Sequence, residues 1–239
     1  MKNISVIFVS LIMSGAAIAK SPYFPDGTIM NIFEFSIKAD KSQRYDEIAK
    51  ETITKSVDQE EGTLAMYSLR HKEDARHAYM IELYKNNQGY QQHINAERYN
   101  NFVALAPEII EKKRQIRVIP QFLGDKHVVR NAETINNLVI VDVKPEFQQA
   151  FKKIVLPEMA ESIKVEPGVL AMYAATEIKN PFRWYFYEIY ASEADYQRHR
   201  ETPHFRTYIR KTAEMTRLKS AIPVRPVLLR NKGGLNAAQ

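Results

Sequence analysis

The chain has 239 residues, 45% of them apolar and 26% charged, which is ordinary for a globular protein and allows one large domain or two small ones. Its net charge of +6 comes from scattered basic residues rather than from a stripe interleaved with aromatics, so nucleic acid binding is disfavoured. The absence of cysteine excludes disulfides, thiolate metal ligands and a thiolate nucleophile.

The N-terminus predicts a secretory signal peptide over residues 1–19. Lys2 gives a short positive region, Ile4–Met13 is an apolar run that is short for a membrane span, and Ala17-Ile18-Ala19 is an A-x-A cleavage pattern. We therefore expect cleavage after Ala19 and a periplasmic or secreted protein. No second apolar run approaches membrane-spanning length, so we expect no membrane span in the mature chain.

A first unit over residues 28–123 has the alternating strand and helix patterns of an α+β domain. Strands are predicted at Ile29–Ile37, Thr63–Arg70, Ala78–Tyr84 and Arg117–Leu123, and helices at Lys41–Val57 and Tyr90–Arg114. Pro120 predicts that the last strand lies at a sheet edge, because proline cannot donate a ladder hydrogen bond.

Residues 124–134 are polar and lack periodicity, which predicts a linker, and the same order of elements begins again over residues 135–230. Strands are predicted at Leu138–Val143, Val169–Glu177, Arg183–Tyr190 and Val224–Arg230, with a helical apolar stripe from Phe147 to Ile163. Ser192 with Asp195 predicts a capped short helix, and Thr202 followed by proline opens another that runs to about Leu218.

The two units are a tandem duplication. Gly62 and Gly168 are 106 residues apart, and the same ungapped shift pairs Met66-Tyr67 with Met172-Tyr173. The shift also pairs Glu82 with Glu188, Tyr84 with Tyr190, His93 with His199 and Pro120 with Pro226. Each unit is therefore predicted to be a βαββαβ repeat of the ferredoxin-like type.

The third strand of the second repeat is apolar on both faces. Trp184 and Phe186 point one way, and Tyr185 and Tyr187 point the other. A sheet covered on one side only would alternate apolar with polar residues. We therefore predict an α+β fold in which the antiparallel sheets of the two ferredoxin-like repeats pack face to face, as an intramolecular pseudo-dimer of the dimeric α+β barrel type.

The stretches "EPGVLAMY" and "YFYEIYASEADYQRHRETPHFRTY" resemble the antibiotic biosynthesis monooxygenase family, in a Pro-Gly strand entry, a strand glutamate and the H…TPHF helix. The resemblance covers nearly all of Leu138–Leu229 and, more weakly, Ile29–Leu123, where "QQHINAERYNNF" replaces the TPHF segment. Members include cofactor-independent monooxygenases of quinols and polycyclic aromatics, haem-degrading enzymes, an isomerase and proteins of no known activity. The family's haem-site positions fall on Val139, His199 and Ile209, which do not match, so haem degradation is disfavoured.

His199 and His204 are the candidate catalytic residues, because an imidazole can act as a base near neutral pH. Candidate substrate-binding residues are Tyr173, Trp184, Glu188 and Arg206. The structural alternatives are a histidine at a chain reversal, core aromatics, a paired strand carboxylate and a solvated arginine. The two histidines are separated by a helix break, and the eight glycines form no phosphate-binding loop, so we expect neither a metal nor a cofactor.

The pattern favours a cofactor-independent monooxygenase that oxidises a quinol or another electron-rich aromatic with O2, with His199 as base and His204 or Arg206 stabilising the anion. Two alternatives stay open: a non-catalytic periplasmic binding or stress-related module, and an isomerase that uses the same pocket without O2. The expected partners are the aromatic small molecule and O2, and association of the tandem unit into a homo-oligomer is left open. Because His204 is replaced by Arg98 in the first repeat, and Trp184 by Ala78, we predict that the second repeat carries the site.

Overall fold

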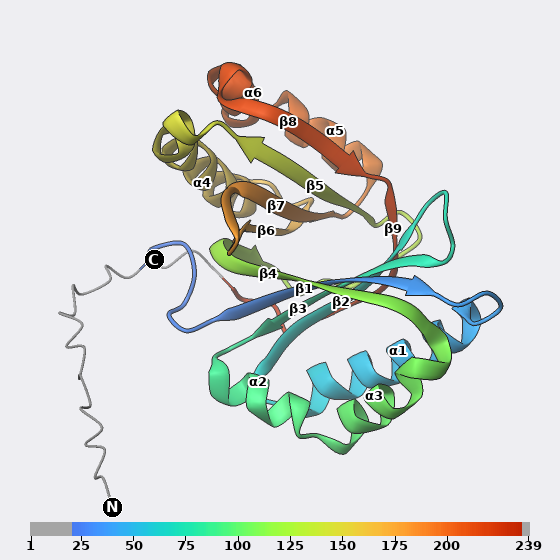
Figure 1. Ribbon diagram of the computed structural model, residues 1–239. Coiled ribbons are helices and arrows are strands. Elements are labelled where there is room, and N and C mark those ends of the chain that lie inside the picture. Colours follow the sequence, from blue (N-terminus) through green and yellow to red (C-terminus); the bar gives the residue numbers. More distant parts are fainter. Residues whose placement is uncertain (1–20, 236–239) are drawn as a thin grey trace, which may run out of the picture.

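The computed structural model describes residues 21–235, so the predicted signal peptide lies outside the described residues (Figure 1). The first repeat consists of β1 (Ile29–Ile37), α1 (Ser42–Gln59), β2 (Thr63–His71), β3 (His77–Tyr84), α2 (Asn87–Ile94), α3 (Glu97–Ile109) and β4 (Ile110–Asp125). The second consists of β5 (Ile135–Val143), a 3-10 turn (Pro145–Phe147), α4 (Gln148–Val165), β6 (Val169–Glu177), β7 (Asn180–Tyr190), α5 (Glu193–Glu201), α6 (Pro203–Thr212), a second 3-10 turn (Ala213–Met215), β8 (Thr216–Ile222) and β9 (Val224–Asn231).

The strands form one nine-stranded antiparallel sheet in the order β8-β5-β7-β6-β4-β1-β3-β2-β9. The last strand of each repeat crosses to the other repeat. The first half of β4 pairs with β1, and its second half pairs with β6. In the same way β8 pairs with β5, while β9 pairs with β2 after a break at Pro223. Because β8 and β9 are the two halves of one crossing strand, the outermost positions of the sheet are joined, and the two repeats close on each other as a barrel-like pseudo-dimer.

The predicted face-to-face packing is confirmed by the largest core cluster, which combines residues of both repeats. It joins Tyr67 and Ile81 of the first repeat to Tyr173, Tyr187 and Ile189 of the second. The helices cover the outer faces of the sheets, with α1 to α3 on one side of the molecule and α4 to α6 on the other (Figure 1). The opposite face of β7 packs under the second set of helices, as its two-sided apolar pattern predicts.

A local twofold axis passes through a buried polar network between the repeats. The hydroxyls of Tyr67 and Tyr173, which are repeat counterparts, lie 2.8 Å apart. Tyr173 donates to Asp125 Oδ2 at 2.5 Å, and the amide of Asn231 donates to the same oxygen at 3.0 Å. Asp125 and Asn231 are also counterparts, 106 residues apart. Contact between counterparts is what a twofold axis produces.

The predicted boundary between the last helix and the last strand of each repeat is wrong. The helix expected to reach Arg114 ends at Ile109, and the one expected to reach Leu218 ends at Thr212. The residues beyond are charged and exposed, and they form the solvent-facing start of β4 and of β8, where no apolar alternation marks a strand. Although β4 as a whole lies between β6 and β1, its pairing with β1 ends at Arg117, and Pro120 pairs with β6 alone, opposite Ala175. Pro120 thus lies where the strand is paired on one side only, as expected for a residue without an N–H to donate.

Among residues 21–235, no helix is both long enough and apolar enough to cross a membrane.

Candidate functional site

A cavity of about 100 Å³ lies in the second repeat, between the sheet and helices α4, α5 and α6. Its walls combine apolar side chains with a few titratable ones. The lining residues are Asn137, Val139, Val141, Val155, Glu158, Met159, Phe186, Glu188, Tyr196, His199, Phe205, Tyr208, Lys219 and Ala221. A mostly apolar hollow with a few convergent polar groups is the usual form of a small-molecule site.

His199 reaches this cavity from the last turn of α5, a helix that begins at the cap residue Ser192, whose hydroxyl accepts from the Asp195 N–H. Only 1% of its side chain is exposed. Its Nδ1 donates to Glu166 Oε1 at 3.0 Å, while Nε2 lies 3.9 Å from Glu158 Oε1 and has no hydrogen-bond partner within residues 21–235. One carboxylate therefore fixes the ring and leaves the second nitrogen able to accept a proton, as in a His–carboxylate dyad.

Glu158 lies in the middle of α4 with 7% of its side chain exposed. Burial raises the pKa of this carboxyl from 4.5 to about 8, with nearby Glu188 and Glu166 adding to the effect and the Ser162 hydroxyl, which donates at 3.0 Å, opposing it. The carboxyl is therefore largely protonated at neutral pH. A protonated Glu158 carboxyl therefore places no negative charge next to His199 Nε2.

His204 contacts the same carboxylate from the first turn of α6, where Thr202 is the N-cap and its hydroxyl accepts from the Phe205 N–H at 3.3 Å. Its Nε2 lies 2.7 Å from Glu166 Oε1. His204 is not among the residues that line the cavity. The structure thus brings the two predicted histidines together through Glu166, and it gives His204 contact with the dyad rather than with the hollow.

The four predicted substrate-binding residues lie in four different places. Glu188 lines the cavity and accepts from the Tyr190 hydroxyl at 3.0 Å. Trp184 is 1% exposed and packs against Phe151 and Phe186 in the helix–sheet core, and Tyr173 lies in the network between the repeats. Neither of these aromatics lines the cavity. Arg206 lies in a separate outer groove beside α5 and α6.

The first repeat keeps the dyad but not the surrounding hollow. His93 Nδ1 contacts Glu60 Oε2 at 2.9 Å, and Arg98, the counterpart of His204, lies 3.4 Å from Glu60 Oε1. Where the second repeat has Val139 and Val141 in the cavity wall, the first has Phe33 and Phe35, whose rings stack 6.0 Å apart in its core. These rings fill space that the valines leave open.

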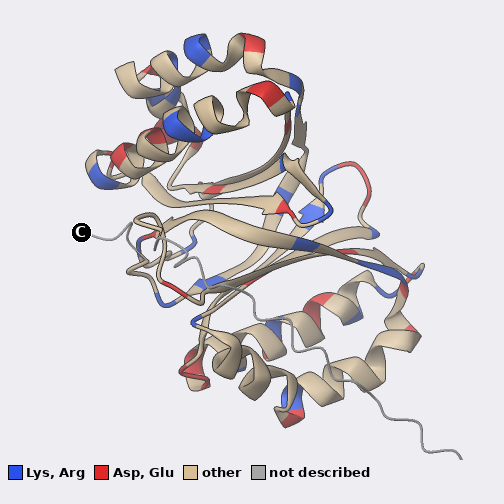
Figure 2. Cartoon of the chain, turned by 60° about the vertical axis from the view of Figure 1, so that its left-hand side comes forward, with Lys and Arg blue, Asp and Glu red and all other residues tan. Residues whose placement is uncertain are grey.

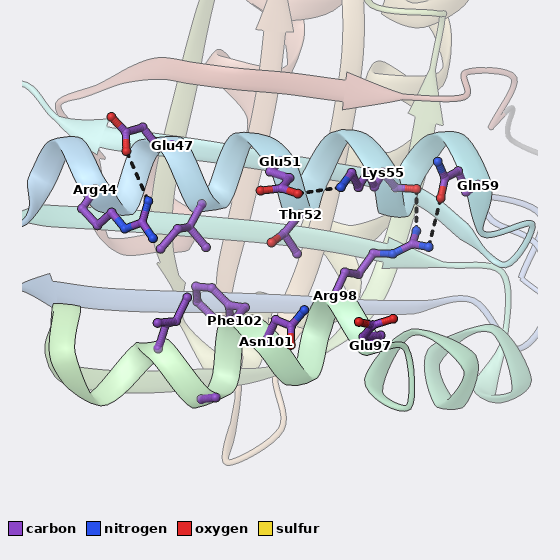
Figure 3. Close-up of a pocket in the computed structure, with 13 residues that line it drawn as sticks. Arg44, Glu47, Glu51, Thr52, Lys55, Gln59, Glu97, Arg98, Asn101 and Phe102 are labelled. Carbon is purple, nitrogen blue, oxygen red and sulfur yellow. Dashed lines mark hydrogen bonds and ion pairs between the residues drawn. The ribbon is translucent and has the colours of Figure 1, made fainter.

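The first repeat carries instead a larger, open groove of about 780 Å³ between α1 and α3 (Figure 3). Its cations are already satisfied: Arg44 pairs with Glu47 at 3.5 Å, and Lys55 with Glu51 at 2.5 Å. Arg98 donates to the Lys55 carbonyl at 2.7 Å. With its charges paired and no candidate catalytic group in its walls, this groove is a less suitable site for chemistry than the smaller cavity.

A metal could be held by Glu158, His199 and His204, which bring one ligand atom each within 4.8 Å of one another. Two imidazoles and a carboxylate are donors that transition metals accept. In the structure, however, Glu166 accepts from a nitrogen of each imidazole. The two imidazoles are hydrogen-bonded to Glu166, while Glu158 lies 3.9 Å from His199 Nε2. Removal of metal ions by a chelator distinguishes a metal centre from a site that works without one.

Three residues of the site were missed by the sequence reasoning. Glu166 has a repeat counterpart in Glu60, so the same 106-residue shift that identified His199 could have found it. Lys219 has the counterpart Lys113 and could have been found in the same way. Glu158 has no such signal, because the first repeat has Thr52 in its place.

A known protein family matches this chain in two segments, one in each repeat. The profile of the antibiotic biosynthesis monooxygenase family matches residues 28–105 and 135–211. A structure from Lactobacillus acidophilus NCFM, named as a proposed monooxygenase, is 28% identical with a TM-score of 0.82, over 87% of this chain and 98% of its own. A second structure, from Fusobacterium nucleatum subsp. nucleatum ATCC 25586, is also named as a proposed monooxygenase. It is 27% identical with a TM-score of 0.82, and the match covers 89% of this chain and 98% of that one. Among curated proteins, none matches.

Proposed function

Because this chain belongs to the antibiotic biosynthesis monooxygenase family, we propose that it oxidises an electron-rich aromatic small molecule, such as a quinol, with O2 in the cavity of the second repeat. The observation that carries the proposal is the Glu166–His199 dyad, in which the buried imidazole presents its second nitrogen, without a hydrogen-bond partner in the described part of the chain, at the wall of a mostly apolar hollow. An apolar wall suits oxidation by O2, since it offers few hydrogen bonds to water beside the reactive intermediates.

The chemistry would be carried by the substrate itself. His199 Nε2 takes a phenolic proton, and Glu166 stabilises the imidazolium through Nδ1. The resulting anion passes one electron to O2, and the radical pair combines at a ring C–H carbon to give a hydroperoxide. Loss of water then leaves a hydroxyquinone: one oxygen atom enters the ring, the other leaves as water, and O2 is the sole oxidant.

The neighbouring groups have distinct roles in this proposal. Protonated Glu158 keeps negative charge away from His199 and can donate to the developing peroxide. Lys219 lies at the cavity wall and can stabilise the phenolate. His204 acts on the reaction through Glu166 and is therefore a positioning residue rather than a catalytic one.

We also propose that the protein works in the periplasm or outside the cell, on the strength of the A-x-A pattern that ends at Ala19.

The test is O2 uptake by the purified protein with a panel of quinols and phenols, with and without a chelator. We expect uptake that a chelator leaves unchanged. Because His199 is 1% exposed, His199→Gln is preferred to alanine, which would leave a cavity in the core. It should lower kcat/KM by about 10²- to 10⁴-fold. The matched control is His93→Gln in the first repeat, which should leave turnover nearly intact, with melting temperatures measured for both variants.

Each other outcome contradicts a particular part of the proposal. Equal losses from the two histidine variants would exclude a site confined to the second repeat. Loss of uptake with the chelator would show that a metal is required. Conversion of the ligand without O2 consumption would identify the isomerase alternative, and tight binding without conversion the binding-module alternative.

A further inference from the structure

An outer groove of about 670 Å³ runs beside α5 and α6, next to the cavity of the second repeat. The two hollows share Tyr196, Phe205 and Lys219 as wall residues. Only these three side chains separate the two hollows, so a ligand that occupies both must pass between them.

The groove is strongly cationic. Arg200, Arg206 and Arg210 line it together with Lys219, against one acidic residue, Glu201. In the described part of the chain, none of the three arginines has an ion pair, whereas the neighbouring Arg198, outside the groove, is paired with Asp195. Figure 2 shows basic segments on these outer helices of the second repeat. The groove thus offers several guanidinium groups without acidic partners, the kind of group that binds carboxylates in a bidentate manner.

The cationic set is specific to the second repeat. The positions of Arg200, Arg206 and Arg210 are taken in the first repeat by Ile94, Asn100 and Ala104. The cations of the first-repeat groove, by contrast, have acidic partners within that repeat. Arg44 pairs with Glu47 and Lys55 with Glu51 (Figure 3), and Arg98 pairs with Glu60. Three unpaired arginines therefore occur beside the one repeat whose cavity is open.

The sizes of the two hollows limit what can bind. A cavity of about 150 Å³ is enough to hold benzene, so the inner cavity of about 100 Å³ has room for a single ring at most, with small adjustments of its walls. A fused polycyclic would not fit within it. Any further part of the ligand must lie in the outer groove, among the arginines.

We propose that the second repeat takes a single-ring phenol or quinol that carries an anionic arm, with the ring in the cavity and a carboxylate-like group bound by Arg200, Arg206 and Arg210. This names the substrate class of the proposed function and rests on it for the role of the ring. In this proposal the three arginines select the substrate by binding its anionic group, and His199 acts as the base in the reaction.

The test is ligand binding under anaerobic conditions, which separates recognition from turnover. The probes are 2,5-dihydroxyphenylacetate, the homologous propionate with a longer arm, and the methyl ester of each. We expect at least one acid to bind tenfold to a hundredfold more tightly than its ester, and this preference to weaken as salt is raised. The triple variant Arg200→Gln/Arg206→Gln/Arg210→Gln should lose the preference while binding the ester as before.

The matched control removes cations elsewhere. Arg76→Gln/Arg225→Gln neutralises two exposed arginines that lie outside the groove, and it should leave the preference for the acid unchanged. Equal binding of acid and ester, retention of the preference in the triple variant, or failure of every probe to bind would overturn the inference. If an acid binds preferentially but no O2 is consumed once air is admitted, the proposed oxidation is wrong and the anion site stands. If acid and ester are oxidised with equal kcat/KM, the oxidation stands and the anion site is wrong.

Discussion

Replacement of the buried carboxyl Glu158 by glutamine should make the protein more stable at alkaline pH. The pKa of Glu158 is raised from 4.5 to about 8, mainly by burial. Between these two values the folded protein retains a proton that the unfolded chain releases, so the folded state becomes less stable as pH rises through this window. The contribution is complete below pH 4.5 and lost once the pH passes about 8. Each pKa unit corresponds to about 1.4 kcal/mol, which gives a total penalty of roughly 5 kcal/mol above pH 8.

The charged groups that face Glu158 do not reverse this sign. Glu188 on β7 and Glu166 after α4 raise its pKa further, and Lys219 on β8 lowers it by less than burial raises it. Two other acids with raised pKa values, the half-buried Glu82 and the buried Asp125, are the same in both proteins. Their effects cancel when the variant is compared with the wild type.

The assay is denaturant unfolding at pH 5, 7 and 9. Trp184 is the only tryptophan and is 1% exposed in the core beside α4, so its fluorescence reports unfolding of the second repeat. Glu158→Gln should match the wild type to within about 1 kcal/mol at pH 5 and exceed it by several kcal/mol at pH 9. Glu161→Gln, an exposed carboxyl on the same helix, is the control for loss of charge alone. A difference between Glu158→Gln and wild type that is the same at pH 5 and pH 9 would refute the assignment of Glu158 as a neutral acid.

Three further predictions concern the cavity, the fold and the N-terminus. Val139→Phe, which copies Phe33 of the first repeat, should fill the cavity and lower ligand affinity more than tenfold while the melting temperature changes little; unchanged affinity would mean that the ligand binds elsewhere. Separately expressed repeats (28–123 and 135–230) should aggregate or self-dimerise, because each loses the sheet that covers its inner face; light scattering that shows two well-behaved monomers would contradict the packing. Exported protein should begin at Lys20, and an intact mass that includes Met1–Ala19 would exclude cleavage at that site.

Much of the fold could be predicted because duplication doubles the signal. A single apolar strand is ambiguous, but Ala78–Tyr84 and Arg183–Tyr190 support each other across the 106-residue shift. The start of β4 could not be found, because its exposed lysines and arginines favour a helix as readily as a strand. The crossing of β4 and β9 between the repeats could not be predicted either, because it depends on how the two sheets meet rather than on any local sequence pattern.

The site was only partly predictable for a related reason. His199 stands out in the sequence because a polar residue recurs in a repeated position, and it does line the cavity. Trp184 and Tyr173 also stand out, but an aromatic residue serves a core as well as a pocket, and only the three-dimensional packing places these two in cores. Glu158 is invisible in the sequence, because its importance comes from burial beside a residue about forty positions away.

The network on the local twofold axis shows what joining the repeats in one chain permits. In a dimer of identical subunits every substitution occurs twice, so an aspartate at the position of Asp125 would meet a second aspartate at the position of Asn231. Two buried carboxyls in contact repel each other unless one takes up a proton. The single chain places an acid on one side and an amide on the other, and Asn231 donates to Asp125 at 3.0 Å. The same freedom lets one half lose its hollow to Phe33 and Phe35 while the other gains a groove of arginines. Covalent linkage thus allows each half of the pseudo-dimer to change without a matching change in the other.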